Sequence, residues 1–417
     1  MIVFSHPTGN QNVRAIVTSL FDEGMLTEFH TSLSIDPGSL WVKLLPEKIR
    51  KDFVRRAFLL PEKKIYTHSY LEFLRLLFTK IHLDYFVRRE HGFASVDAIY
   101  HKIDKSVAKR LGVLNKSNKV KAVYAYEDGA LATFSLAKKL GLTCIYDLPI
   151  AYWETARRLM NEEAERLPNW ANTLGGGIND SPMKLERKTK ELELADVIIY
   201  PGKFVEDSLP AWATQKKLIM APFGSPNVSG AINFKTKDEV VKGKRPLRVL
   251  FVGSMGQRKG LGDLFAAMQL LNRQDFELVV LGSLLAPIDF YKNQFPNFIY
   301  EPGRPNSEVL ELMRSCDVFC LPSIVEGRAL VMQEAMSQGL PIIITPNTGG
   351  EDLIIDGCTG FLVPIRSPEI IAEKLNWFNE NRSKLTEMSN FAKAHADKYT
   401  WTNYTSKIIE GINNTIN

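Results

Sequence analysis

The chain has 417 residues, of which 45% are hydrophobic and 24% charged, and its formal net charge is +5. This length and apolar content allow two α/β domains with separate cores and exclude a low-complexity or disordered chain. No stretch approaches eighteen consecutive apolar residues and the chain opens without a signal-peptide pattern, which predicts a cytoplasmic protein without a transmembrane helix.

Short apolar runs alternate with helical patterns along the first half, an order that is typical of parallel sheets covered by helices. The strands predicted there are residues 2–4, 122–125, 144–147, 197–200 and 218–222. A polar loop at residues 5–12 follows the first strand and leads into an apolar-periodic helix at residues 13–20. This half is predicted to be one domain, residues 1–224.

Polar residues follow two of these strands and are candidates for lining a site. Because ligands bind outside the carboxyl ends of parallel strands, such residues are expected to face a crevice. The candidates on this side are His6, Gly9, Asn10, Glu127 and Asp128. A structural role explains a single histidine equally well, and a cap between strand and helix explains the acidic pair.

Residues 40–110 are strongly basic, with 16 Lys and Arg against 8 Asp and Glu, so their net charge of +8 exceeds that of the whole chain. Ile49, Phe53, Ala57 and Leu60 follow a helical spacing, and residues 70–87 are rich in Leu and Phe. Two interpretations remain open: a helical subdomain with a solvated basic face, or a surface for an anionic membrane. Buried aromatic residues and the lack of a recognisable module argue against nucleic acid as a partner.

Residues 225–246 are polar, contain Gly and Pro and lack periodicity, which predicts a linker. A second doubly wound domain is predicted at residues 247–400, and residues 401–417 form an aromatic and apolar helix candidate. The strands predicted in this domain are residues 248–252, 278–281, 298–300, 318–321, 342–345 and 360–363.

A glycine-flanked loop after the first of these strands carries two adjacent cations. Arg258 and Lys259 lie between Gly253 and Gly260, where a helix opens. Such a loop offers positive charge and backbone N–H groups to a phosphate. A Walker-type loop is excluded, because Lys259 follows Arg258 rather than Gly and precedes Gly260 rather than Ser or Thr.

Two glutamates, Glu326 and Glu334, lie eight positions apart across a loop-to-helix junction, with the helix predicted at residues 330–337. Glu326 therefore precedes the helix and Glu334 lies about one turn inside it. The free N–H groups and the dipole at this helix start suit a pyrophosphate, which leaves the carboxylates to bind hydroxyls. Taken alone, each glutamate also fits an acid that complements the helix dipole.

The pattern PSxxEGxxLVxxEAMxxGLPIIxTxxxGG at residues 322–350 closely resembles the donor-site signature of retaining glycosyltransferase family 4. Residues 247–271 are similar to the first strand, phosphate loop and first helix of that family's C-terminal domain, and a weaker similarity covers residues 186–402. The resemblance implies the GT-B fold, with two Rossmann-like domains facing a cleft and a C-terminal helix that returns to the N-terminal domain. It also implies a glycan-assembling enzyme that transfers a sugar from a nucleotide-sugar to a glycan or lipid-linked acceptor with retention.

The resemblance assigns roles to individual residues. It implies that Glu326 orients the transferred sugar and steadies positive charge near the anomeric carbon, whereas Glu334 accepts hydrogen bonds from the ribose. The residues that it implies on the donor side are Gly253, Arg258, Lys259, Gly282, Glu301, Gly327, Arg328, Ala329, Leu330 and Glu334.

Two segments depart from the family pattern. Relatives usually have an aromatic or small residue and then Gly after E-G, whereas this chain has Arg328 and Ala329, so that Arg328 adds a cation near the phosphates or the acceptor. Many relatives carry a histidine after the strand that corresponds to residues 144–147. Here Asp147 is the candidate catalytic partner of the acceptor hydroxyl, or alternatively a turn cap before Pro149.

The chain has no D-x-D motif, so the built-in cations are expected to replace a metal ion and no cofactor is predicted. The expected partners are a nucleotide-sugar, a glycan or lipid-linked acceptor and an anionic membrane surface, with a location in the cytoplasm or on the inner face of the cell membrane. An epimerase or phosphorylase on the same fold is the alternative enzyme. A catalytically degenerate binding subunit would be favoured by loss of Arg258, Lys259, Glu326 or Glu334, all of which are present.

Overall fold

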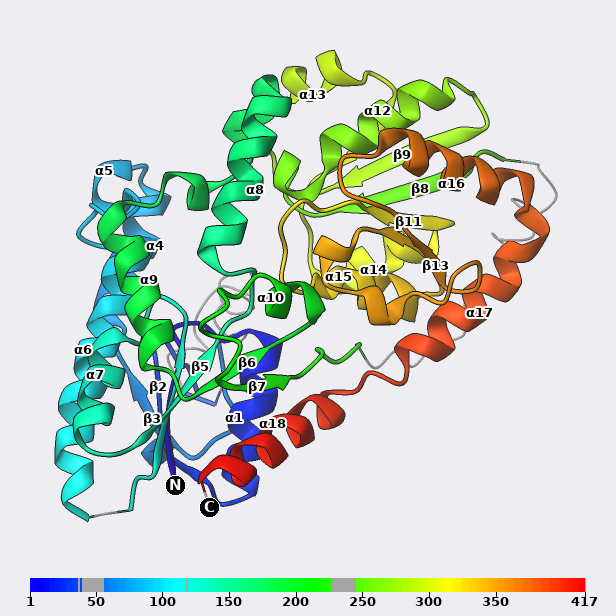
Figure 1. The fold of residues 1–417 in the computed structure, drawn as a ribbon. Helices are drawn as coiled ribbons and strands as arrows, with labels where there is room; N and C mark the ends of the chain where they lie inside the picture. The colour runs from blue at the N-terminus through cyan, green and yellow to red at the C-terminus, as the bar shows by residue number, and fades with distance from the viewer. Residues whose placement is uncertain (37, 40–55, 118, 227–244, 417) are drawn as a thin grey trace.

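The computed structural model describes residues 1–36, 38–39, 56–117, 119–226 and 245–416. Two parallel β-sheets, each covered by helices, form two Rossmann-like domains (Figure 1). The predicted α/β fold class is therefore confirmed. The first 16 residues of the basic segment, 40–55, and most of the predicted linker, 227–244, lie outside the described residues, as do Ile49 and Phe53 of the helical pattern.

The N-terminal sheet has the strand order β3-β2-β1-β4-β5-β6-β7, so the order reverses between β1 and β4. Its strands are β1 (Ile2–Ser5), β2 (Leu26–Thr31), β3 (Ile65–Thr67), β4 (Ala122–Tyr126), β5 (Thr143–Asp147), β6 (Val197–Tyr200) and β7 (Lys217–Met220). Adjacent residues face opposite sides: Tyr124 packs with β1 and α18, whereas Val123 packs with the opposite cluster.

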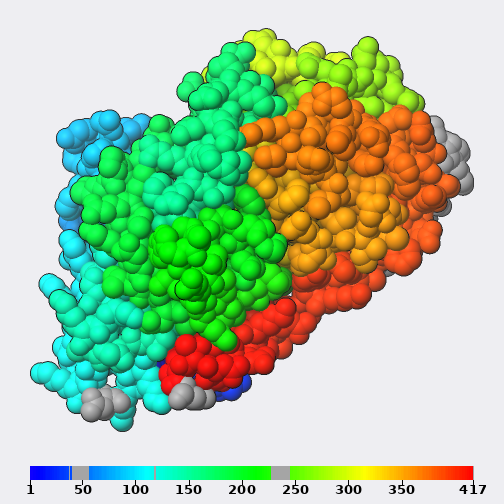
Figure 2. Space-filling view, viewed as in Figure 1, coloured from blue at the N-terminus to red at the C-terminus, as the bar shows by residue number. Residues whose placement is uncertain are grey.

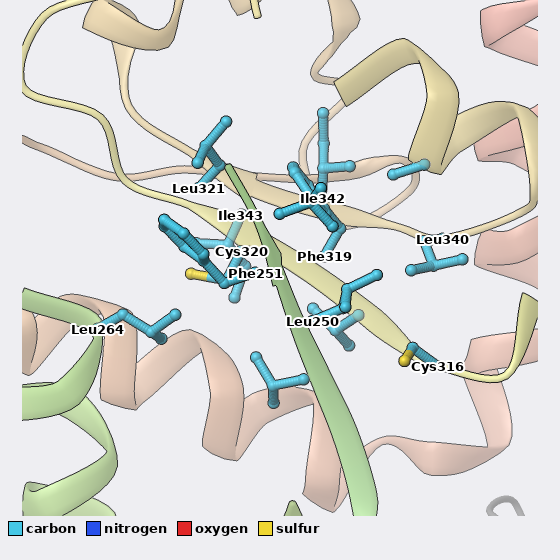
Figure 3. Packing of buried hydrophobic residues seen from close by; sticks show 14 of the residues in the cluster. Leu250, Phe251, Leu264, Cys316, Phe319, Cys320, Leu321, Leu340, Ile342 and Ile343 are labelled. Atoms are coloured by element: carbon cyan, nitrogen blue, oxygen red, sulfur yellow. The ribbon is translucent and has the colours of Figure 1, made fainter. Parts of the chain in front are cut away.

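The C-terminal sheet has the order β10-β9-β8-β11-β12-β13, with its reversal between β8 and β11. Its strands are β8 (Leu247–Val252), β9 (Phe276–Leu281), β10 (Phe298–Glu301), β11 (Val318–Leu321), β12 (Ile342–Ile344) and β13 (Gly360–Leu362). Figure 3 shows the core around β8 and β11, where Phe251, Phe319 and Cys320 are fully buried. Ligands of open parallel sheets bind at such a reversal point, which is where the loops after β8 and β11 lie. The space there between the two domains, lined by Ile150 on one side and Arg258 and Val325 on the other, is called the crevice below.

Helices connect the strands and cover both sheets. In the first domain they are α1 (Gln11–Asp22), α4 (Tyr70–Lys80), α5 (Asp84–Val87), α6 (Val96–Leu114), α7 (Leu131–Lys139), α8 (Trp153–Arg166), α9 (Pro182–Leu194) and α10 (Lys203–Asp207). The remaining helices are α12 (Leu261–Leu271), α13 (Ile288–Gln294), α14 (Asn306–Arg314), α15 (Leu330–Ser337), α16 (Pro368–Glu380), α17 (Leu385–Ala396) and α18 (Trp401–Ile416).

The C-terminal helix α18 lies against the N-terminal sheet. Its buried residues Tyr404, Ile408 and Ile412 belong to the same apolar cluster as residues of β1 and α1. Figure 1 shows the red α18 reaching the N-terminal domain, so that the two chain ends lie near one another.

Phe58 of the basic segment is buried as predicted, but several other aromatic residues of this segment are exposed, contrary to the prediction. Those exposed on and after α4 are Tyr70, Phe73, Tyr85, Phe86 and Phe93. Tyr70 and Phe73 are exposed because α4 packs with its other side, where Leu71 contacts the core and Glu72 is buried. Among the described helices, none has the length and hydrophobicity that crossing a membrane requires.

Candidate functional site

The loop between β8 and α12, residues 253–260, is called the cationic loop below. It contains a short 3-10 turn, η5 (Gln257–Lys259), and ends at Gly260 in a left-handed conformation with φ of 74°. A Cβ at Gly260 would lie 1.9 Å from the Pro322 carbonyl oxygen, so only glycine permits this approach to the β11 loop. The cationic loop is thereby pressed against the segment that leads to Glu326.

Both cations of this loop bind one carboxylate of the neighbouring loop after β11. Arg258 Nη1 lies 2.9 Å and Lys259 Nζ 2.6 Å from Glu326 Oε1. The side chains are 26%, 14% and 11% exposed in the order Arg258, Lys259, Glu326, so the cluster is partly shielded from water yet open to a ligand. Two positive charges against one negative charge leave an excess that attracts an anion.

Backbone contacts fix the position of the Arg258 side of this cluster. The Arg258 carbonyl oxygen accepts hydrogen bonds from the Ile324 and Val325 N–H groups at 2.9 and 3.3 Å. Arg258 Nη1 also donates to the Val325 carbonyl oxygen at 3.0 Å. The guanidinium group is therefore held at the crevice before any ligand arrives.

Three of the residues expected on the donor side, Gly253, Gly282 and Glu301, lie at the carboxyl ends of β8, β9 and β10. The Gly282 N–H donates to the Glu301 carbonyl oxygen at 3.1 Å, and a Cβ at Gly282 would lie 1.7 Å from the Gly253 carbonyl oxygen. The Glu301 carboxylate is paired with Arg304. The structure thus brings Gly253, Gly282 and Glu301 close to one another.

Helix α15 begins at Leu330, with Ala329 as its N-cap residue, so Glu326 precedes the helix and Glu334 lies one turn inside it. Glu334 Oε1 accepts a hydrogen bond from Asn306 Nδ2 at 2.8 Å, and burial raises the pKa of its carboxyl group. The Ala329 N–H donates to the Thr348 carbonyl oxygen at 3.3 Å.

Arg328 is placed differently from the expectation of a cation open to phosphates. Its side chain is fully buried and donates to Asp352 at 2.7 and 3.1 Å, to Gln333 Oε1 at 2.9 Å and to the Gly349 carbonyl oxygen at 3.1 Å. Its guanidinium also lies over the Tyr399 ring. Since Asp352 already neutralises this charge, Arg328 holds the C-terminal domain together rather than offering a cation to the crevice.

The two domains touch at the residue after Glu326. A Cβ at Gly327 would lie 1.7 Å from the Pro149 carbonyl oxygen, and the Ala151 N–H donates to the Glu326 carbonyl oxygen at 3.3 Å. The loop after β5 therefore lies directly on the segment that carries the key carboxylate. Any residue with a side chain at 327 would push the domains apart.

Asp147, at the end of β5, is buried and accepts a hydrogen bond from the Tyr124 hydroxyl at 3.0 Å. Burial raises the pKa of Asp147 to about 7, although the bond from Tyr124 favours the charged form. His6 is also fully buried: its Nδ1 lies 2.9 Å from the Thr8 carbonyl oxygen, and burial lowers the pKa of its ring to about 3. His6 is therefore neutral near pH 7.

The remaining N-terminal candidates divide into two groups. Gly9 and Asn10 form the loop before α1, and Asn10 is exposed there as the N-cap residue. Glu127 and Asp128, in contrast, are paired with cations of α9: Lys188 Nζ lies 2.8 Å from Glu127, and Arg187 lies 2.8 Å from Asp128. This acidic pair stabilises the packing of α9 and presents no free carboxylate to the crevice.

Sequence reasoning missed an arm of the N-terminal half that supports the cationic loop. This arm consists of α8 and the 3-10 turn η3 (Pro168–Thr173), and its Trp170 belongs to the C-terminal core, beside Phe265 and Tyr291. Although Trp170 comes before the predicted boundary at residue 224, it buries its ring in the core of the C-terminal domain. Figures 1 and 2 show α8 crossing to the C-terminal domain.

The arm contacts the cationic loop through Gln257, the residue before Arg258. The fully buried Gln257 donates through Nε2 to Glu163 at 2.7 Å and to Asp263 at 2.9 Å, while its N–H donates to Thr173 Oγ1 at 3.0 Å. Arg166 pairs with both carboxylates as well. Only the polar residues of the arm could have suggested this contact, and their spacing resembles that of an ordinary solvated helix.

Replacing Glu163 by Ala is expected to lower the free energy of unfolding by about 3 to 5 kcal/mol, because its fully buried carboxylate also binds Arg366 at 2.8 Å. The matched change at the neighbouring Glu162, whose side chain is 39% exposed, should cost less than about 1 kcal/mol. Urea denaturation followed by tryptophan fluorescence measures both. Equal losses in the two variants would contradict the bracing role of the arm.

The sequence of residues 233–395 matches the protein family described as glycosyl transferases group 1. A D-inositol 3-phosphate glycosyltransferase of Paenarthrobacter aurescens is 31% identical over 185 residues, which cover 40% of this chain and 45% of the relative. The putative colanic acid biosynthesis glycosyltransferase WcaL of Salmonella typhimurium is 32% identical over 149 residues, 32% of this chain and 36% of the relative. The chain thus matches less than half the length of these curated relatives.

Solved structures resemble the whole chain in fold. The sucrose-phosphate synthase of Thermosynechococcus elongatus has a TM-score of 0.63 at 14% identity and covers 99% of this chain and 98% of its own. Anabaena HepE in complex with UDP has a TM-score of 0.61 at 15% identity and covers 99% of both chains. At these identities the likeness establishes the shared two-domain fold.

Proposed function

We propose that this chain, whose residues 233–395 belong to the glycosyl transferases group 1 family, transfers a sugar from a nucleotide-sugar to a glycan or lipid-linked acceptor. The observation that carries the proposal is the convergence of Arg258, Lys259 and Glu326 at the reversal point of the C-terminal sheet. The position is where ligands bind in such sheets, and the charges suit a diphosphate.

The diphosphate takes the place that Glu326 occupies in the structure. A doubly charged diphosphate competes with a single carboxylate for Arg258 and Lys259 and binds them more strongly. Glu326, which is released by this exchange, turns to the sugar next to the diphosphate. There it orients a hydroxyl and stabilises the positive charge that develops at the anomeric carbon as the leaving group departs.

The acceptor enters from the N-terminal domain. A cavity of about 180 Å³ reaches Arg258 and Val325 from that side, between Ile150 and the glycines at 175–177. Asp147 lies only three residues before Ile150, and we propose it as the acidic partner of the acceptor hydroxyl, directly or through movement of this loop. A second cavity of about 550 Å³ lies between α6 and α9, and its lining includes charged side chains that form ion pairs, such as Lys184 with Asp97 at 2.8 Å. It lies on α6 and α9, away from the crevice that carries Glu326.

Transfer is proposed to retain the anomeric configuration, as in the family that the sequence resembles. The acceptor oxygen attacks the anomeric carbon from the face of the leaving diphosphate, so one carbon–oxygen bond forms as the other breaks. The acceptor proton passes to a phosphate oxygen, and the cations of the loop hold the charge that remains. Proton NMR of the fresh product distinguishes this course from inversion, which would contradict it.

Thermal stabilisation by a panel of nucleotide-sugars and nucleoside diphosphates tests the proposed function. Uridine nucleotides come first, since the solved neighbour HepE binds UDP and UDP-glucose. A ligand present at 100 times its dissociation constant should stabilise the fold by about 2.7 kcal/mol. If no member of the panel stabilised the protein, this result would contradict a nucleotide-sugar site and would favour the binding-subunit alternative.

Transfer is expected to continue in excess EDTA, because Arg258 and Lys259 supply the charge that a metal ion provides in D-x-D enzymes. Initial rates with and without the chelator should agree closely, after dialysis of the protein against EDTA. Complete loss of activity that Mn²⁺ or Mg²⁺ restores would show that the reaction needs a metal ion and would contradict this prediction.

A further inference from the structure

Helices α4 and α5 present an apolar surface to solvent. Residues 70, 73, 77 and 81 share one helical face, and Tyr70 and Tyr85 are 68% and 79% exposed. We call this the α4–α5 surface, and its six residues are Tyr70, Phe73, Leu77, Ile81, Leu83 and Tyr85. A soluble chain seldom gathers large apolar side chains in this way unless they bind something.

The opposite side of α4 fixes this orientation. Leu71 packs on the N-terminal core, and the buried Glu72 accepts hydrogen bonds from Arg56 at 2.9 Å and Arg75 at 2.7 Å. Arg75 lies on α4 itself, so the Arg56–Glu72 pair is the contact that ties the helix to another segment, and turning the apolar face inward would break it. Exposure of this face is a consequence of how the helix is anchored.

Positive charge surrounds the end of the apolar surface. Residues 80–89 contain three cations, Lys80, Arg88 and Arg89, and one acid, Asp84. All four side chains are exposed, although Arg89 also pairs with Asp180. Aromatic and aliphatic side chains flanked by Lys and Arg are the composition that binds the interface of an anionic bilayer.

We propose that the α4–α5 surface docks this protein on an anionic lipid membrane. Tyr85, Ile81 and their neighbours enter the headgroup region, while Lys80 and Arg88 bind lipid phosphates. The attachment is peripheral, since none of the described helices is able to span a bilayer. Residues 56–110, the part of the basic segment that the structure describes, contain 11 Lys and Arg against 6 Asp and Glu, and this excess of positive charge adds longer-range attraction to an anionic membrane.

The position of the α4–α5 surface means that docking would bring the crevice between the domains close to the membrane. Figure 1 shows α5 at the end of the N-terminal domain toward which the sheet strands run, on the same side as α8. A membrane at this end would lie near the crevice between the domains, where a lipid-linked acceptor must arrive. This consequence rests on the proposed function, whereas docking itself does not.

Flotation of the full chain with vesicles tests the proposal. Vesicles of phosphatidylcholine mixed with phosphatidylglycerol should carry the protein, and vesicles of phosphatidylcholine alone should carry much less. Ile81→Ser with Tyr85→Ser should abolish binding, whereas Lys80→Ala and Arg88→Ala should each weaken it about fivefold. Raised salt should weaken it further. The matched control is Leu270→Ser with Phe391→Ser, which removes two exposed apolar side chains of the C-terminal domain and should bind like the parent.

Three results would overturn the proposal. They are equal binding by the Ile81/Tyr85 variant and the parent, failure of the parent to bind anionic vesicles, and a surface that proves to hold a second copy of the chain. In the last case the parent sediments as a dimer, the Ile81/Tyr85 variant as a monomer, and vesicles bind neither. An unchanged melting temperature and unchanged nucleotide binding confirm that each variant is folded. Nucleotide binding also separates this test from the proposed function, because the diphosphate site lies in the other domain.

Discussion

Replacing Glu326 by Gln is expected to lower turnover by about 100- to 1,000-fold, while the nucleoside diphosphate binds at least as tightly as it does to the parent. The two effects have opposite signs because Glu326 has two roles. It stabilises charge on the sugar during transfer, but in the free protein it competes for Arg258 and Lys259 at 2.9 and 2.6 Å. The neutral amide of the variant does not stabilise charge on the sugar, and it competes less with the diphosphate for Arg258 and Lys259.

Initial rates and calorimetric titration with the diphosphate measure the two effects separately. Glu369→Gln, an exposed glutamate of the same domain, serves as the control and should change neither. Parent-like turnover in the Glu326 variant would remove this residue from the reaction. Weaker diphosphate binding would instead show that Glu326 supports the diphosphate site rather than competing with the ligand.

Replacing Lys259 by Ala is expected to weaken diphosphate binding about tenfold to hundredfold, the usual effect of losing a hydrogen bond to a charged group. Arg258→Ala should weaken binding at least as much, because Arg258 also donates to the Val325 carbonyl oxygen and so holds the β11 loop. The exposed Lys292 provides the control for a loss of charge, and its change to Ala should leave affinity unchanged. Parent-like affinity in both variants would rule out the phosphate role of the loop.

The apolar strands and the motif around Glu326 could be predicted from the sequence, because both depend on local patterns. Strand β2 was missed since Glu28 and His30 interrupt its apolar run. Both are buried, and the Glu28 carboxylate accepts a hydrogen bond of 3.0 Å from Arg110. Arg110 lies on α6, 82 residues further along the chain. A long-range partner of this kind leaves no local signal in one sequence.

The predicted positions of several residues differ from their positions in the structure for one physical reason, which is that long-range contacts decide them. Arg328 lies two residues after Glu326, yet Asp352 neutralises it, so its nearness to Glu326 in the motif did not place its charge in the crevice. Gln257 and Glu163 were missed because they act through contacts between domains. The exposed aromatic residues of α4 were assigned to the core since composition does not tell which face of a helix packs.

We propose that Arg258, Lys259 and Glu326 form a nucleotide-sugar site, and a crystal structure of the complex with an intact nucleotide-sugar is the decisive test. We expect diphosphate oxygens within hydrogen-bonding distance of both cations, with the Glu326 carboxylate moved from them to a hydroxyl of the sugar. A diphosphate bound elsewhere, with Glu326 still paired to Arg258 and Lys259, would contradict it.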